Sequence, residues 1–248
     1  MLKDVEKTVN ELIIWIQDYF EKNGKNCKAV LGVSGGKDST VTAALLAKAL
    51  GKDRVIGVMM PNGEQADIAD SVQACEVTGI QNLTINIKDA TEGLINSLKA
   101  GGSEITDDVR INIPPRVRMT TLYAVAQGQR EGGRVINTCN RSEDFIGYST
   151  KFGDSAGDVS LLADFLVEEV RQIGDYLGLP ENLVHKKPSD GLCGLTDEDK
   201  IGFTYDTLDK YIATGVCEDE EIKKKIDRMH KLNLHKLELM PHFENKNN

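Results

Sequence analysis

The stretch Ala29-Val-Leu-Gly-Val-Ser-Gly-Gly-Lys-Asp-Ser-Thr40 decides the fold, because an apolar run breaks into small residues and then continues as the helical pattern of residues 41–50. This order predicts a buried strand, a tight loop and a helix. The small residues Ser34, Gly35 and Gly36 let the backbone turn sharply, and the helix that follows directs its positive dipole end at the loop. The sequence therefore predicts an anion site suited to phosphate.

This loop differs from a Walker A loop, because Gly32 and Gly36 enclose three residues and Lys37 precedes Asp38. A carboxylate beside phosphates is repulsive unless a divalent cation lies between them, so Asp38 is predicted to bind Mg²⁺. The alternative is an ordinary glycine turn in which Asp38 stands only at the start of the helix. The pattern Ser-Gly-Gly-x-Asp-Ser resembles the signature of the PP-loop, or N-type, ATP pyrophosphatases, which cleave ATP to AMP and pyrophosphate while adenylating a substrate.

The composition is that of an ordinary globular protein. Of the 248 residues, 40% are hydrophobic and 28% are charged, which is enough apolar material for a full core. We expect one domain over residues 1–248. The formal net charge of −9 argues against a broad nucleic-acid-binding face, since phosphate neutralisation requires clustered Lys and Arg.

Cysteine usage and the N-terminal pattern indicate a cytoplasmic protein. The chain has no C-x-x-C pair, so we predict reduced thiols rather than zinc or an iron–sulfur cluster at Cys27, Cys75, Cys139, Cys193 and Cys217. Residues 1–5 open directly into an amphipathic pattern, and no apolar run approaches the roughly 18 residues of a membrane span. Neither a membrane nor a nucleic acid is expected as a partner.

Alternating strands and helices predict an α/β doubly wound parallel sheet flanked by helices, with a helical C-terminal part. The predicted strands cover 29–32, 54–60, 83–87 and 134–138, and the predicted helices cover 5–23, 41–50, 64–78, 90–99, 113–126, 164–177, 205–213 and 219–232. Ligands bind outside the carboxyl ends of such strands, so the Ser34 loop and the polar loop 139–145 should face one site.

Three further segments carry functional signals. Arg116 and Arg118 fall in the first turns of the helix predicted for 113–126, where cations oppose the helix dipole, so either an anionic partner or ordinary surface ion pairs would hold them. The glycine-rich run 147–160 is long for a connection and is typical of a functional loop. The polar run 186–197 predicts a mobile lid.

Several separated motifs, in the same order, resemble ammonia-dependent NAD synthetase over essentially the whole chain. They are Asn137–Glu143, Thr150–Asp154, Asp158, Lys187–Asp190 with Thr196–Glu198, and His235-Lys236. The resemblance implies the PP-loop fold, which is similar to adenine nucleotide alpha hydrolases. It also implies ATP-dependent amidation of deamido-NAD with ammonia to NAD, through an acyl-adenylate and with release of AMP and pyrophosphate, as the last step of NAD biosynthesis.

The resemblance also implies a homodimer and a set of site residues. ATP would be held by Gly32, Val33, Ser34, Gly35, Gly36, Lys37, Asp38, Ser39, Thr138 and Ser189. Deamido-NAD would be held by Arg116, Lys151, Asp158, His235 and Lys236. Two hard oxygen ligands suit Mg²⁺, so Asp38 and Glu143 would hold the metal. Asp158 is a further catalytic candidate, because a carboxylate near the adenylate could attract ammonium and take its proton.

One departure from the family concerns a lysine. Many members place a Lys that reaches ATP in the helix after the glycine-rich loop, where this chain has Val167. Lys37 could supply that charge, or its side chain could point to solvent. The rival functions are a tRNA sulfur-transfer protein, which needs paired cysteines and a basic RNA face, and a non-catalytic nucleotide-binding regulator, which the Asp38 and Glu143 pair disfavours.

Overall fold

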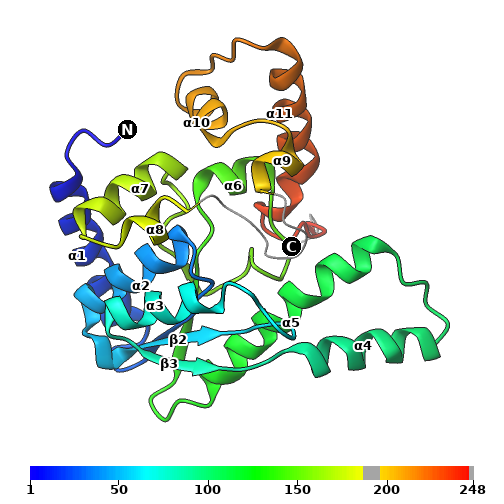
Figure 1. Cartoon of the computed structure of the whole chain (residues 1–248), viewed down its shortest axis with the longest axis horizontal. Helices are drawn as coiled ribbons and strands as arrows, with labels where there is room; N and C mark the ends of the chain where they lie inside the picture. Colours follow the sequence, from blue (N-terminus) through cyan, green and yellow to red (C-terminus); the bar gives the residue numbers. More distant parts are fainter. Residues whose placement is uncertain (187–195, 246–248) are drawn as a thin grey trace.

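The sheet has five parallel strands in the order β3-β2-β1-β4-β5, in a computed structural model that describes residues 1–186 and 196–245. The strands are β1 (Lys28–Gly32), β2 (Val55–Met59), β3 (Gln81–Thr84), β4 (Gly133–Asn137) and β5 (Val159–Ser160). Figure 1 shows helices packed around this sheet. The predicted α/β doubly wound architecture is confirmed.

The strand order places a topological switch point at the centre of the sheet. From β1 the chain moves outward through β2 to β3, and it then returns to the other side of β1 to form β4 and β5. The crevice beyond the carboxyl ends of β1 and β4 is where ligands bind in such sheets. The Ser34 loop follows β1 and residues 138–146 follow β4, so both reach this crevice.

Helices cover both faces of the sheet because each apolar strand face needs a partner. The larger core cluster joins the sheet to α1 (Val5–Asn23), α2 (Lys37–Leu50), α3 (Ile68–Thr78), α7 (Val167–Tyr176) and α8 (Glu181–Val184). A second cluster lies on the opposite face and includes α5 (Asp107–Gln127), against which α4 (Lys88–Ala100) packs. A short 3₁₀ helix, Lys52–Arg54, precedes β2.

The C-terminal part is helical, as predicted. It contains α9 (Asp197–Ile201), α10 (Tyr205–Thr214), α11 (Glu220–Asn233) and a 3₁₀ turn, Leu234–Lys236. Together with α6 (Arg141–Ile146) and the first residue of α7, these helices enclose a third apolar cluster. In Figure 1 this part stands above α6, away from β2 and β3.

The predicted start of α5 was wrong. The helix begins at Asp107 rather than Ile113, because the Thr106 side chain accepts a hydrogen bond from the Val109 N–H and caps it there. Both prolines at 114 and 115 therefore lie inside the helix. Arg116 and Arg118 consequently lie well beyond the first turn, so the helix dipole does not explain their positions.

Other boundaries also differ from the prediction. The strand expected at 83–87 lies at Gln81–Thr84, although the Ile85 N–H donates to the carbonyl of Met59 at the end of β2 and the Ile87 N–H donates to that of Pro61. The structure adds α6 within the predicted polar loop, together with β5, α8 and α9. Most of the predicted lid falls on 187–195, outside the described residues. Across the described part, no helix is long and apolar enough to cross a membrane.

Candidate active site

The loop between β1 and α2 is held by its own side chains. The Ser34 hydroxyl accepts a hydrogen bond from the Gly36 N–H at 3.3 Å and lies 3.2 Å from the Ser39 hydroxyl, which donates to the Gly36 carbonyl. Gly35 adopts a φ of +76°, and a Cβ there would lie 2.6 Å from the backbone of Asp70. The loop therefore requires glycine at this position. The first N–H groups of α2, which follow it, have no partner within the helix.

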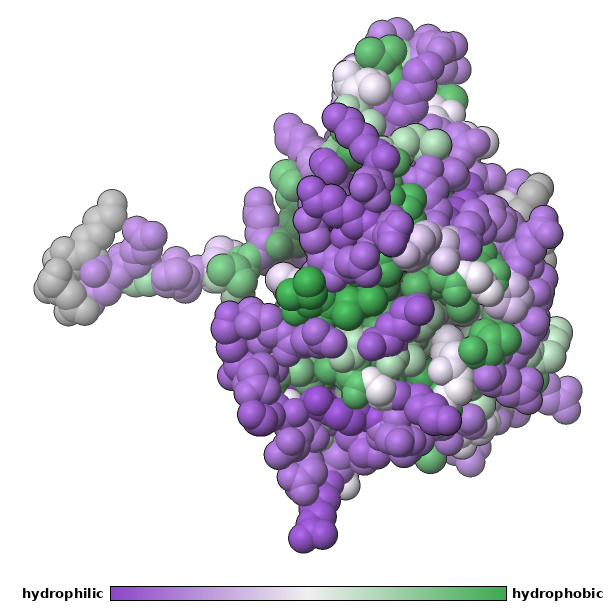
Figure 2. All heavy atoms as spheres, turned by 90° about the vertical axis from the view of Figure 1, so that its left-hand side faces the viewer, coloured by the Kyte–Doolittle hydropathy of each residue, from purple (hydrophilic) through white to green (hydrophobic). Residues whose placement is uncertain are grey.

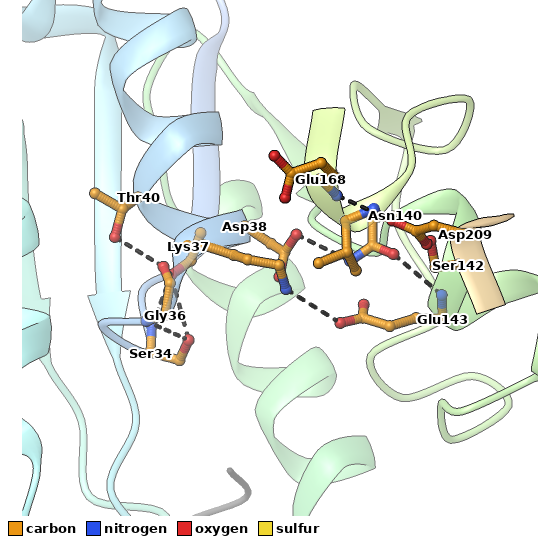
Figure 3. A network of polar contacts seen from close by, with 12 residues as sticks. Ser34, Gly36, Lys37, Asp38, Thr40, Asn140, Ser142, Glu143, Glu168 and Asp209 are labelled. Carbon is orange, nitrogen blue, oxygen red and sulfur yellow. Dashed lines mark hydrogen bonds and ion pairs between the residues drawn. The ribbon is translucent and has the colours of Figure 1, made fainter. Parts of the chain in front are cut away.

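One amide joins the two loops that were expected to share a site. Asn140 is fully buried; its Nδ2 donates to Oδ1 of Asp38 at 3.0 Å, and its Oδ1 accepts from the Glu143 N–H at 3.0 Å. The second bond caps α6. Asn140 therefore aligns the carboxylate at the start of α2 with the carboxylate in the first turn of α6 (Figure 3).

Lys37 occupies the space between these carboxylates. Its Nζ lies 2.7 Å from Oδ2 of Asp38 and 3.8 Å from Oε1 of Glu143, and the residue is only 3% exposed. Of the two alternatives that the sequence left open, the structure selects the inward one, because the side chain turns away from solvent toward the carboxylates (Figure 3). Val167 is fully buried in the third apolar cluster and offers no charge to this site.

The electrostatics of the pair favour a cation. Burial, followed by repulsion from Asp38, raises the pKa of Glu143 to about 8, while Lys37 opposes that shift. The charges of Asp38 and Glu143 raise the pKa of Lys37 despite its burial. Mg²⁺ commonly takes one or two protein carboxylates and completes its shell with water and substrate phosphates, so this pair fits it. Within the described ranges, no three His, Cys, Asp or Glu residues are grouped to hold a metal without such help.

Tyr205 borders the same site from α10. Its side chain is fully buried, the Lys37 ammonium lies 5.8 Å from its ring centroid, and its hydroxyl has no hydrogen-bond partner within the described chain. Burial and the nearby Glu143 raise its pKa. An orphaned buried hydroxyl is costly, which is typical of a position where a ligand or water supplies the missing partner.

A buried carboxylate connects the C-terminal helices to the site. Asp209 of α10 accepts hydrogen bonds from the Ser142 hydroxyl of α6 and from the Glu168 N–H of α7, the latter at 3.0 Å. The Ser142 hydroxyl in turn accepts from the Val167 N–H at 3.1 Å. This network fixes α6, and with it Glu143, against the first turn of α7.

A second polar region lies beside the first. A cavity of about 290 Å³ is lined by Asn137, Asp144, Ser155, Gly157, Asp158, Val159, Ser160, Lys236 and Leu237. Asp144 follows Glu143 in α6, so adjacent carboxylates serve the two regions. Burial, with a contribution from Asp154, raises the pKa of Asp144 to about 6.

Four of the five residues predicted to bind deamido-NAD gather around the loop 147–151. Arg116 donates to the Lys151 carbonyl at 3.2 Å, and the Lys151 ammonium donates to the His235 carbonyl at 2.6 Å. Lys236 donates to the carbonyls of Gly147 and Ser149 at 2.6 and 2.8 Å. Residues far apart in sequence are thus brought to one place, although their polar atoms are engaged with the protein's own backbone.

Asp158 has a different setting from the one expected of a proton acceptor. Its Oδ2 accepts from the Val135 N–H of β4 at 2.7 Å, and its Oδ1 accepts from the Tyr123 hydroxyl at 3.2 Å. The carboxylate therefore anchors the start of β5 beside β4. It also borders the cavity that contains Asp144 and Lys236.

The remaining predicted ATP residues have the following positions. Val33 is buried and its N–H donates to the Val58 carbonyl, so this N–H is not available to a ligand. Thr138 follows the end of β4 and is half-buried, while Ser189 lies outside the described residues. The sequence interpretation missed Asn140, Tyr205 and Asp209. Only Asn140 carried a recognisable signal, an Asn three residues before a Glu at a helix start.

Comparisons with known proteins identify the family of this chain. The family model for NAD synthase matches residues 8–248. The NH(3)-dependent NAD(+) synthetase of Pyrococcus furiosus is 36% identical over 250 residues, covering 94% of this chain and 93% of that protein. The structure of NMN synthetase from Francisella tularensis matches with a TM-score of 0.86 and 32% identity, covering 97% of this chain and 99% of the other. For NH3-dependent NAD synthetase from Campylobacter jejuni the TM-score is 0.78 at 26% identity, with 97% and 100% covered. The chain therefore belongs to the NAD synthase family.

Proposed function

We propose that this chain is an ammonia-dependent NAD synthetase, which amidates deamido-NAD to NAD and cleaves ATP to AMP and pyrophosphate in the process. The observation that carries the proposal is the meeting of the phosphate-type loop with the Asp38 and Glu143 carboxylates at the switch point of the sheet. The curated relative from Pyrococcus furiosus bears that name and matches nearly the whole chain. In the reaction, the nicotinate carboxylate attacks the ATP α-phosphorus and releases pyrophosphate, and ammonia then displaces AMP.

Each part of the site has a role in this reaction. The N–H groups at the start of α2 would bind the phosphates and stabilise charge on the departing pyrophosphate. Asp38 and Glu143 would hold Mg²⁺, which when bound supplies further charge stabilisation at the phosphates. Asn140 keeps the two carboxylates in register. No side chain has to form a covalent intermediate, so positioning and exclusion of water account for the remaining catalysis.

The cavity beside α6 is the proposed site for the pyridine nucleotide. Asp144, Asp158 and Lys236 line it, and it adjoins the metal region through consecutive residues of α6. Arg116, Lys151 and His235 lie next to the loop that leads to the cavity. A dinucleotide that spans these groups would place its carboxylate toward Glu143 and the ATP phosphates.

A second candidate substrate is nicotinate mononucleotide. The specific observation is the TM-score of 0.86 to NMN synthetase from Francisella tularensis, against 0.78 to the Campylobacter jejuni NAD synthetase. The two reactions share the amidation chemistry and differ in how much of the nucleotide must be bound. If binding energy from the distant adenosine is used to align the carboxylate, the shorter substrate loses turnover as well as affinity.

Steady-state kinetics at saturating ATP and ammonium separate these candidates. We expect kcat/KM for deamido-NAD to exceed that for nicotinate mononucleotide and for nicotinate, with kcat also lower for the truncated substrates. A higher kcat/KM for nicotinate mononucleotide would replace the proposed substrate and leave the ATP site unchanged. Pyrophosphate release that needs none of the three would point to another adenylating enzyme.

A homodimer is part of the proposal. Ile14 and Trp15 of α1 are 64% and 47% exposed, and Figure 2, which faces that side of the molecule, shows apolar side chains exposed in the middle of the face. Two copies joined through α1 would cover this surface. Analytical ultracentrifugation of Trp15→Glu against Lys7→Glu, an exposed change in the same helix, tests the interface. Loss of the dimer only in the Trp15 variant is the expected result.

The remaining parts of the proposal concern organisation and location. We take residues 1–248 as one NAD synthetase domain, acting without nucleic acid or membrane partners. Four described cysteines, Cys27, Cys75, Cys139 and Cys217, carry free thiols, which suits a reducing compartment such as the cytoplasm.

A further inference from the structure

Lys37 presents an unusual combination of charge, burial and position. It is the first residue of α2, it is 3% exposed, and its ammonium lies between the carboxylates of Asp38 and Glu143. A buried ammonium is costly unless anions pair with it, and here two carboxylates do so. The side chain thus occupies the place where a divalent cation would bridge the same two groups.

The neighbouring helix α7 places no other positive charge between the Asp38 and Glu143 carboxylates. Val167 at the start of α7 is apolar and fully buried. Arg171, one turn further along α7, pairs with Glu168 at 3.3 Å and Asp206 at 3.8 Å instead. The aromatic ring of Tyr205 lies beneath the Lys37 ammonium and adds a favourable cation–π contact.

We propose that Lys37 is an internal counter-ion that competes with the divalent metal for Asp38 and Glu143 and binds an ATP phosphate once the metal takes the carboxylates. An ammonium and a divalent ion repel each other too strongly to share the space between two carboxylates. Once the carboxylates hold the metal, the nearest other anion for the Lys37 ammonium is an ATP phosphate at the N-terminus of α2, because Lys37 is the first residue of that helix. The inference rests on the proposed function, since it requires a site that accepts both metal and ATP.

This exchange makes the binding of metal and ATP cooperative. Without nucleotide, a metal must displace the ammonium and leave it unpaired, so metal alone binds weakly. With ATP present, the displaced ammonium gains a phosphate partner. By linkage, metal must strengthen ATP binding by the same factor as ATP strengthens metal binding.

The test measures Mn²⁺ binding to the nucleotide-free protein, by electron paramagnetic resonance of the free ion, for wild type and Lys37→Met. Methionine keeps most of the length of the stem and removes the charge. We expect Lys37→Met to bind Mn²⁺ about tenfold more tightly, because the competing cation is gone. We expect it to bind ATP at saturating Mn²⁺ about tenfold more weakly, because a charge-assisted phosphate contact is lost. The control is Lys48→Met, an exposed lysine of the same helix, which should change neither affinity.

A second variant covers the possibility that Lys37→Met does not fold. Lys37→Arg keeps the positive charge, so its Mn²⁺ affinity should not rise above that of wild type. Unchanged Mn²⁺ affinity in folded Lys37→Met, or a rise in Lys37→Arg equal to that of Lys37→Met, would overturn the inference. NAD formation by wild type is measured in parallel: its absence would refute the proposed function, whereas tighter Mn²⁺ binding by Lys37→Met would still support the counter-ion.

Discussion

Asn140 donates a hydrogen bond from Nδ2 to Oδ1 of Asp38 across 3.0 Å, and through its Oδ1 it also caps the helix that carries Glu143. A single buried amide therefore sets the relation between two carboxylates that are far apart in sequence. The loop after β4 and the start of α2 are joined by this contact at the switch point of the sheet.

Replacement of Asn140 by Ala should affect both stability and catalysis. The cap contributes about 1 kcal/mol and the bond to a charged carboxylate about 1.5–3 kcal/mol, so we expect a loss of roughly 2–4 kcal/mol in the free energy of unfolding by urea. Turnover should fall as the carboxylates lose alignment. Thr106→Ala removes the cap of α5, away from the site, and should cost about 1 kcal/mol with turnover unchanged. Equal turnover in both variants would refute the aligning role.

Gly35→Ala tests the packing of the loop against α3. We expect a loss of about 3 kcal/mol or more, because a positive φ is strained for Ala and the added Cβ overlaps the Asp70 backbone. Gly178→Ala is the matched control, since Gly178 has a φ of +71° but no heavy atom within 4 Å of the place that a Cβ would take. It should show only the backbone strain of about 1 kcal/mol. If both variants lose the same stability, the contact with α3 is unimportant.

Glu143→Gln tests whether the charge of Glu143 is needed for turnover rather than for stability. Turnover at saturating substrates should fall by about 10²-fold or more, because a charge that holds the metal is removed. The free energy of unfolding should change little, since the charge is disfavoured by burial, which raises the pKa of Glu143 to about 8. Asp164→Asn, at a carboxylate 96% exposed, serves as control and should leave turnover intact. Retained activity with unchanged metal dependence in Glu143→Gln would remove Glu143 from the site.

Substitutions of Asp158 test whether this carboxylate anchors β5 to β4 or accepts a proton in the reaction. An amide can accept from the Val135 N–H and donate to the Tyr123 oxygen, so Asp158→Asn should keep most of the turnover if anchoring is the main role. Asp158→Ala should lose both bonds and about 1–3 kcal/mol of stability. A drop of about 10²-fold in Asp158→Asn, with stability preserved, would instead support the proton-accepting role that the resemblance suggested.

Tyr123 adds a pH-dependent readout of the same contact. Burial and the Asp158 carboxylate raise its pKa from 10.0 to about 12. The folded state therefore favours the neutral phenol, so this contribution to stability is complete below pH 10.0 and is lost as the pH rises toward 12. Ultraviolet titration should show more than one tyrosine ionising late, since the pKa of the buried Tyr205 is raised as well, and Asp158→Asn should lower the pKa of Tyr123. An unchanged titration would mean that the two side chains do not interact.

The fold could be predicted where a local sequence pattern falls on an element that is buried in the structure. The apolar run 29–32, the small residues after it and the helical pattern beyond predicted the order of β1, loop and α2 correctly, although α2 begins at Lys37 rather than Val41. The start of α5 was mispredicted because Pro114 and Pro115 favour a helix start beside them, whereas the cap at Thr106 sets it earlier. The edge strand β3 is exposed along its length, so its alternating pattern located it only approximately.

The site could be predicted as a set of residues but not as a set of contacts. The loop sequence indicated an anion site, and the motifs after β4 indicated a second carboxylate facing Asp38. The inward turn of Lys37 depends on the depth of the crevice, which no local pattern reveals. The contacts of Tyr205 and Asp209 come from α10, whose packing over α6 and α7 is a tertiary effect.

The most direct test of the proposed function is the stoichiometry of products formed from ATP, deamido-NAD and ammonium with Mg²⁺, for wild type and Asp38→Asn. We predict that wild type forms NAD, AMP and pyrophosphate in equal amounts, and that Asp38→Asn forms them at least about 10²-fold more slowly. Wild type that makes no NAD, or Asp38→Asn that makes it at the wild-type rate, would contradict the central claim.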